Sequence, residues 1–182
     1  KLLIDGSEIS GITKTKTTSG YSCSYKPSTA LSDGSHTVVV KASDYDGNAA
    51  TQKSVSFKID TVPPTLSITA PADKLVTNKT AVTVTGTTND ATSSPVTVTV
   101  KLNSGTAETV TVGSDGTFSK ALTLVTGTNT ITVVAKDSAG KTTTVTRTVT
   151  VDTTAPVIKS VTINPNPVDC GKTYVISVEV TD

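Results

Sequence analysis

Apolar residues recur at every second position in several short stretches of the chain, with threonine in many of the positions between them. The clearest stretches lie at residues 66–69, 81–87, 95–102, 109–112, 117–122, 129–136 and 142–151. A period of two is typical of strands that bury one face. Turn-forming sequences rich in Asn, Asp, Gly and Ser separate the stretches. No stretch has a helical period, so we predict an all-β fold.

The chain contains an internal repeat with a period of about ninety residues. The motif Ala-x-Asp-x-x-Gly occurs at residues 42–47 and again at 135–140, a shift of 93. The motif Asp-Thr-x-x-Pro occurs at 60–64 and again at 152–156, a shift of 92. This period is too long for a solenoid unit, but seven or so strands in about ninety residues are typical of a two-sheet sandwich. We therefore predict tandem β-sandwich modules.

One complete module and two partial ones account for the sequence. Residues 64–152 contain every strand of the sandwich and form the middle module. Residues 1–60, the first module, align only with its second part, and residues 156–182, the third module, align only with its first part. We therefore expect an internal piece of a longer protein. The linkers, 61–63 and 153–155, are short and followed by proline, which favours a semi-rigid rod.

Charge and motif content argue against several function classes. The net charge is +1 without a basic cluster, so neither nucleic acid nor an anionic membrane is a predicted partner. No apolar run approaches the ~20 residues of a membrane helix, so we predict no membrane insertion. The one histidine, His36, has Asn129 at the equivalent repeat position, and no catalytic motif is present. We predict no catalytic residues and no enzyme.

These features resemble the bacterial immunoglobulin-like repeats of surface adhesins, cell-wall proteins and bacteriophage tail proteins. The boundary motifs at 60–64 and 152–156, the segment 127–131 and the two Ala-x-Asp-x-x-Gly turns carry the resemblance. It implies tandem immunoglobulin-like β-sandwiches outside the cell, on a bacterial surface, in a cell wall or in a phage virion. The implied function is a structural spacer or stalk that projects a functional domain, with proteins as partners. The alternative is an adhesive or host-receptor-binding segment.

Carbohydrate binding is a further function that similar sandwiches perform. Such sites stack sugars on exposed aromatic side chains, but the only aromatic residue of the middle module, Phe118, has an inward-facing position. In the first module Tyr21 and Tyr25 alternate as core residues do, which leaves Tyr45 at a loop tip. A single exposed tyrosine is ordinary surface. The sequence therefore favours a spacer or adhesive role over a carbohydrate-binding module.

Aspartates near the module boundaries are the candidate metal ligands. Asp44 and Asp46 share one loop with Asn48, and we expect Asp60, which begins the linker, at the same end of the module. Hard cations bind several carboxylate and amide oxygens at once. The sequence therefore suggests a calcium ion, as the one candidate cofactor, at this module junction.

The second junction offers a related set of carboxylates. Asp137 and Asp152 are its candidate ligands, together with Asp182 of the third module. The resemblance implies the same chemistry, because related adhesin repeats place calcium at module junctions with aspartates in comparable loops. Lys141 stands where the first loop has Asn48, which weakens the second site. The alternative for all these aspartates is a turn-forming role through hydrogen bonds to backbone N–H groups.

The two cysteines lie in different modules with the whole middle module between them. A disulfide between Cys23 and Cys170 of one chain is therefore not expected, because the Cα atoms of a disulfide lie within about 7 Å. Cys23 lies between two tyrosines at strand spacing, so we predict a small buried apolar residue. Cys170 lies in a turn sequence and is predicted to be exposed.

Overall fold

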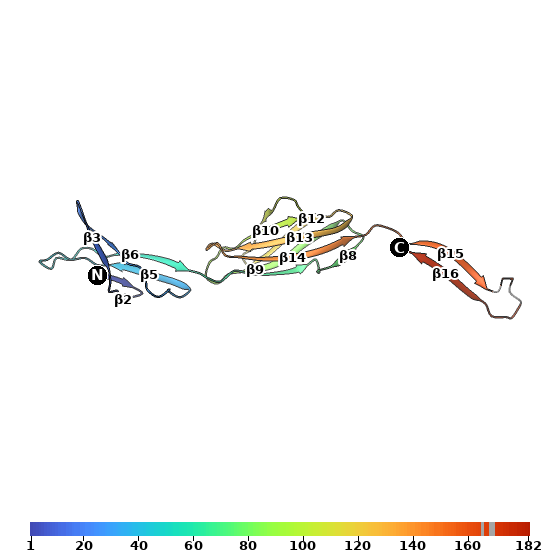
Figure 1. The fold of residues 1–182 in the computed structure, drawn as a ribbon, viewed down its shortest axis with the longest axis horizontal. Coiled ribbons are helices and arrows are strands. Elements are labelled where there is room, and N and C mark those ends of the chain that lie inside the picture. The colour runs from blue at the N-terminus through green and yellow to red at the C-terminus, as the bar shows by residue number, and fades with distance from the viewer. Residues whose placement is uncertain (165, 168–169) are drawn as a thin grey trace.

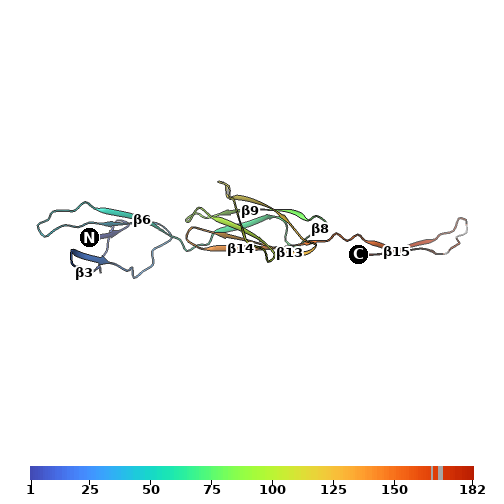
Figure 2. The ribbon, with the colours of Figure 1, turned by 90° about the horizontal axis from the view of Figure 1, so that it is seen from above.

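The computed structural model describes residues 1–164, 166–167 and 170–182, and within them it contains strands and no helix. Three groups of strands follow one another along the long axis of the molecule (Figures 1 and 2). None of the described segments is a helix with the length and apolar character needed to cross a membrane. The all-β prediction is confirmed.

The middle group forms a sandwich of two sheets. One sheet has the strand order β11-β10-β13-β14-β8 and the other the order β12-β9-β7. Neighbouring strands are antiparallel except β8, which pairs parallel with β14. The strands are β7 (Thr65–Ala70), β8 (Leu75–Thr77), β9 (Ala81–Asn89), β10 (Thr97–Leu102), β11 (Glu108–Val110), β12 (Thr117–Thr123), β13 (Gly127–Lys136) and β14 (Thr142–Val151).

One hydrophobic core fills the space between these two sheets. Along β13, Ile131 and Val133 are buried, whereas Thr128 and Thr130 face outward, as the period of two predicts. The buried apolar side chains are Ile68, Val84, Val98, Val100, Val110, Phe118, Leu124, Ile131, Val133, Ala135, Val149 and Val151. Both sheets contribute to this set, so the sandwich encloses a core of its own.

Phe118 is the only aromatic residue of the middle module and depends on a glycine opposite it. Its side chain is 4% exposed, and it pairs with Gly86 on the neighbouring strand β9. A Cβ atom at position 86 would lie 2.6 Å from Cζ of Phe118 and 2.3 Å from the backbone oxygen of Ser67. The glycine therefore makes room both for the ring and for the approach of β7.

Replacing Gly86 by alanine is expected to lower the free energy of unfolding by about 1–3 kcal/mol, because the added methyl group overpacks the core and presses on a backbone atom. Denaturant unfolding followed by circular dichroism measures the change. The exposed Thr83 on the same strand provides the control. Thr83→Ala should change the stability by less than Gly86→Ala, and equal effects of the two would contradict this account of Gly86.

The first group of strands forms a sheet and a separate hairpin. The sheet has the order β2-β1-β5-β6, and β3 and β4 pair only with each other. The strands are β1 (Leu2–Ile4), β2 (Ser7–Glu8), β3 (Thr13–Thr17), β4 (Gly20–Ser24), β5 (Gly34–Val40) and β6 (Lys53–Ile59). The third group is one antiparallel pair, β15 (Val157–Asn164) and β16 (Val175–Thr181).

The prediction of buried residues on the β4 strand is wrong. Cys23 is exposed and Tyr21 is 71% exposed, while Tyr25, which follows directly after β4, is half-buried. In the middle module β12 pairs with β9, which also pairs with β7, but in the first module β4 pairs with β3 alone among the described strands, so this hairpin is not part of a larger sheet. A cavity of about 940 Å³ lies beside these three side chains. Cys170 is exposed, as predicted, and both cysteines are free.

Candidate cation site at the first module joint

The direction of the strands in each hairpin decides which aspartates meet at a joint, that is, at the junction between two neighbouring modules. β5 and β6 form an antiparallel pair along their full length of seven residues. Asp60 directly follows β6, whereas Asp44 and Asp46 lie in the turn that connects β5 to β6. The two positions are therefore at opposite ends of the hairpin, separated by roughly 20 Å of strand. The expectation that Asp60 shares an end with Asp44 and Asp46 is wrong.

The same geometry holds in the middle module. Asp137 begins the turn between β13 and β14, and Asp152 directly follows β14. These two residues therefore lie at opposite ends of a ten-residue hairpin, roughly 30 Å apart. The β13–β14 turn faces the first module, so Asp137 belongs to the first joint and Asp152 to the second (Figure 1). Their predicted grouping in one site is wrong for the same reason.

Three carboxylates from different segments meet at the first joint. Asp60 comes from the linker, Asp90 from the loop after β9, and Asp137 from the β13–β14 turn. One carboxylate oxygen of each lies within 4.8 Å of the others. Asp60 and Asp137 are both candidate ligands from the sequence, but of different sites, whereas Asp90 lies in a turn sequence, Asn89-Asp90, that does not indicate a ligand. We refer to these three residues as the joint cluster.

Hydrogen bonds between two loops hold Asp90 against Asp137. The Oδ1 atom of Asp90 accepts hydrogen bonds from the N–H groups of Thr92 (2.8 Å) and Ser93 (2.6 Å), which shapes the loop after β9. The carbonyl oxygen of Ser93 accepts hydrogen bonds from the N–H (3.1 Å) and the hydroxyl (3.0 Å) of Ser138. Because Ser138 follows Asp137, this contact fixes the two acidic loops side by side.

Asp60 and Asp137 each use one oxygen and leave the other without a partner. Oδ1 of Asp60 accepts a hydrogen bond from the N–H of Val62 (3.0 Å), and Oδ1 of Asp137 accepts one from the N–H of Lys141 (2.8 Å). Both Oδ2 atoms are buried and have no hydrogen-bond partner within the described residues. Asp137 is only 5% exposed. An unpartnered buried acceptor is costly, so this arrangement calls for a further group.

The charge of the joint cluster points to a cation as that group. None of the three carboxylates forms a salt bridge with a basic side chain among the described residues. Two like charges at this separation repel by roughly 3 kcal/mol at an effective dielectric constant of about 20. Calcium binds oxygen at about 2.3–2.6 Å, so two ligands of one ion lie up to about 5 Å apart. The spacing of the joint cluster therefore fits a single calcium ion.

Models of known protein families match both larger parts of the chain. Residues 1–61 match a bacterial Ig-like domain, and residues 64–153 match domain B of glucodextranase. Together with the two-sheet sandwich of the middle group, these matches agree with the resemblance drawn from the sequence. The chain is a tandem array of immunoglobulin-like modules.

Solved structures similar to this immunoglobulin-like array include multi-module proteins. The fibronectin(III)-like modules of Clostridium thermocellum CbhA are 21% identical over 83% of this chain and 76% of theirs, with a TM-score of 0.42. A tetra-tandem repeat from the extending region of a large adhesion protein is 23% identical over 98% of this chain, with a TM-score of 0.43. An engineered protein is 23% identical over 49% of this chain, with a TM-score of 0.39.

This chain covers about half, 54%, of the length of the adhesion-protein repeat structure, and it covers 20% of the length of the engineered protein. A search of curated proteins gave no match.

The other predicted metal ligands of the array have different surroundings. Both carboxylate oxygens of Asp44 accept hydrogen bonds from Asn48, one from its backbone N–H and one from its side-chain amide, each at 2.7 Å. The side-chain amide, followed by the backbone N–H, lowers the pKa of Asp44. Asp46 and Asp152 are exposed, and Asp152 accepts a hydrogen bond from the N–H of Thr154 (2.9 Å). These contacts fit the turn-forming alternative for Asp44 and Asp152.

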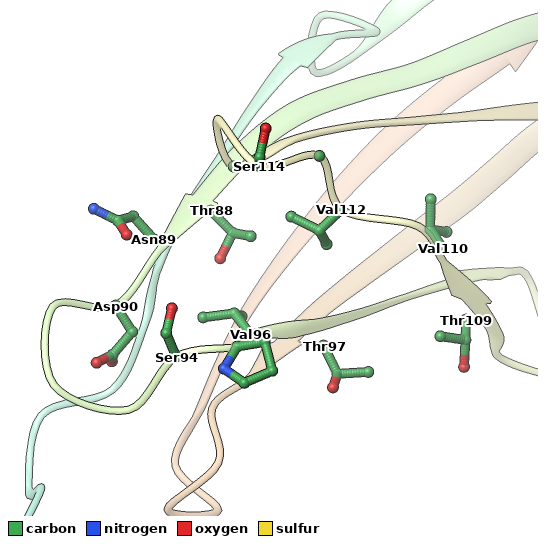
Figure 3. A pocket seen from close by; sticks show the side chains of 13 residues that line it. Thr88, Asn89, Asp90, Ser94, Val96, Thr97, Thr109, Val110, Val112 and Ser114 are labelled. Atoms are coloured by element: carbon green, nitrogen blue, oxygen red, sulfur yellow. The ribbon is translucent and has the colours of Figure 1, made fainter.

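A cleft of about 480 Å³ opens beside Asp90, between the loop after β9 and the segment that follows β11 (Figure 3). Threonine, serine and valine side chains supply most of its lining, and none of the lining residues is aromatic. The cleft therefore lacks the aromatic surface on which carbohydrate-binding sandwiches stack sugar rings. The joint cluster remains the candidate functional site.

Proposed function

We propose that this immunoglobulin-like array is a spacer or stalk whose first joint is locked by a divalent cation, with calcium as the best-fitting ion. The observation that carries the proposal is the pair of buried, unpartnered carboxylate oxygens of Asp60 and Asp137 across the linker. A cation between them would connect the linker of the first module to two loops of the middle module. Its binding would replace mutual repulsion by attraction to a shared charge.

Two further contacts support a joint of defined geometry. The ammonium group of Lys58 at the end of β6 donates a hydrogen bond to the carbonyl oxygen of Thr92 in the middle module (3.2 Å). Asp33 accepts hydrogen bonds from the backbone N–H and the hydroxyl of Thr61 in the linker, both at 2.9 Å. The linker is thus held to the first module and the first module to the middle one, but by few contacts, so a bound cation would dominate the joint.

The expected setting of such a spacer is extracellular. A calcium-locked joint suits a place where calcium is abundant, on a bacterial surface, in a cell wall or in a phage virion. The partners in this proposal are proteins, namely the neighbouring modules and the functional domain that the stalk projects. The array would act without enzymatic activity, because its contribution is reach and stiffness.

Calcium titration by isothermal calorimetry tests the cation site. We expect heat from one site at the first joint, and a loss of affinity of roughly tenfold or more in Asp137→Asn, because a charged ligand is removed. The matched control is Asp46→Asn, which neutralises an exposed aspartate in the corresponding turn of the first module. This variant should bind calcium as the unmodified protein does.

An absence of binding heat in the unmodified protein would overturn the proposed site. Equal losses of affinity in Asp137→Asn and Asp46→Asn would also overturn it, since the effect would then follow the overall charge and not the joint cluster. Magnesium as a competing ion provides a second comparison, because it requires shorter bonds of about 2.0–2.1 Å and a stricter octahedron.

A further inference from the structure

His36 of the first module is held between two hydrogen-bond acceptors. Its ring is 5% exposed, with Nδ1 2.7 Å from Oδ2 of Asp5 and Nε2 2.7 Å from the carbonyl oxygen of Ser32. A carboxylate and a carbonyl both accept and do not donate, so each ring nitrogen must carry a hydrogen. The geometry therefore requires the doubly protonated, positively charged imidazolium form.

The middle module has an uncharged pair of residues at the positions equivalent to His36 and Asp5. Asn129 occupies the position of His36, and Asn103 occupies that of Asp5. The Oδ1 atom of Asn103 accepts a hydrogen bond from the N–H of Thr130 (2.7 Å), just as Oδ1 of Asp5 accepts one from the N–H of Thr37 (2.8 Å). Both acceptor residues have a positive φ, 51° for Asn103 and 49° for Asp5. The ionic pair is thus particular to the first module.

The imidazolium lies one residue away from the contact that holds the linker. Ser32, whose carbonyl oxygen accepts the hydrogen bond of His36, directly precedes Asp33. Asp33 binds both the N–H and the hydroxyl of Thr61, and Thr61 directly follows Asp60. A continuous chain of contacts therefore connects His36 to the linker carboxylate of the joint cluster.

We propose that His36 is a proton-sensitive positioning residue, which in its imidazolium form holds the loop at Ser32 and Asp33 and thereby presents Asp60 to the cation site. The inference rests on the proposed function for its effect on cation binding. Loss of one proton from His36 leaves a ring with a single N–H group. The N–H stays with the charged carboxylate of Asp5, because hydrogen bonds to ionised acceptors are stronger. The lone pair of Nε2 then faces the carbonyl oxygen of Ser32, and the loop is released.

The groups around His36 determine the pH range of this effect. Asp5 is the carboxylate in contact with the ring, and Asp33 is the nearby acid of the loop. On β6, the ring of Phe57 packs against that of His36 with 5.6 Å between the centroids, and the ammonium group of Lys58 is directed away to Thr92. The hydrogen bond to Asp5 is the largest of the effects that raise the pKa of His36 above its ordinary value of 6.5. The contact is therefore complete below about pH 6.5 and is lost as the pH rises through the higher pKa of the folded protein.

Nuclear magnetic resonance tests the connection without any cation. Because His36 is the only histidine, its ring signals report its titration directly. In the presence of a chelator, the amide signal of Thr61 is expected to titrate with the same apparent pKa as the His36 ring. The double variant with His36→Asn and Asp5→Asn copies the uncharged pair of the middle module, Asn129 and Asn103. In this variant the Thr61 signal should not move over the pH range in which His36 titrates. A Thr61 amide that ignores the titration of His36 would overturn the inference.

Calcium affinity measured across the same pH range separates this inference from the proposed function. We expect the affinity of the unmodified protein to fall about fivefold as His36 loses its proton, and that of the double variant, His36→Asn with Asp5→Asn, to stay constant. Identical pH profiles in both proteins would contradict the positioning role while leaving the cation site intact. An absence of calcium binding at every pH would defeat the proposed function, and the Thr61 titration would then decide the positioning role alone.

Discussion

Replacement of Phe118 by alanine is expected to lower the free energy of unfolding of the middle module by about 3–5 kcal/mol. The ring is 4% exposed and is the only aromatic side chain in this core. Its removal leaves a cavity over Gly86, which has no side chain to fill it. A domain of this size has about 5–15 kcal/mol of stability in total, so the variant should lose a large share of it.

Hydrogen exchange of the β13 amides, followed by mass spectrometry, reports the stability of the middle module separately from its neighbours. The matched control is Phe57→Ala in the first module, where the ring is 38% exposed. That variant should leave the exchange of β13 unchanged. If Phe118→Ala exchanged as slowly as the unmodified protein, the assignment of Phe118 as the centre of this core would be wrong.

The strands of the middle module were largely predictable, because the period of two extends over whole strands. The predicted strand at 142–151 coincides with β14, and the one at 81–87 lies within β9, which continues to Asn89. β8 was missed, since it has only three residues, Leu75–Thr77, and no alternation can be detected over so short a stretch. Its parallel pairing with β14 depends on the fold and not on local sequence.

The joint cluster was only partly predictable, because a turn sequence does not reveal which other loop it meets. Asp60 and Asp137 were recognised as candidate ligands, but each was grouped with the aspartate at the other end of its own hairpin. The direction of the antiparallel strands brings the β13–β14 turn toward the preceding linker. The alternating directions of the predicted strands do indicate that each such turn lies at the opposite end of its module from the linker that follows. Asp90 gave no signal beyond its turn, since its role depends on the neighbouring module.

The burial of Cys23 was mispredicted for a related reason. Alternation shows that a strand has two unlike faces, but a two-stranded hairpin cannot bury one of them without further strands beside it or another element packed on it. β12 of the middle module has β9 beside it, whereas β4 pairs only with β3. The local pattern of the two strands is similar, and the difference lies in their neighbours.

Removal of calcium is expected to turn the first joint from a fixed connection into a flexible one. Without the ion, the three carboxylates of the joint cluster repel one another, and the Lys58–Thr92 contact is an exposed hydrogen bond of little strength. The sandwich core of the middle module does not depend on the joint, so its sheet content should stay the same. Asp137→Asn should behave in the presence of calcium much as the unmodified protein behaves without it.

The distance distribution across the first joint, measured by pulsed electron paramagnetic resonance, tests the cation-locked joint most directly. One spin label is attached to Cys23, which is exposed in the first module, and the other to Thr144→Cys on the outer face of β14, in a Cys170→Ser background. We predict a single narrow distribution in calcium and a broad one in chelator, with Asp137→Asn broad in both and Asp46→Asn matching the unmodified protein. Distributions of equal width in calcium and in chelator would contradict the proposal that a cation locks this joint.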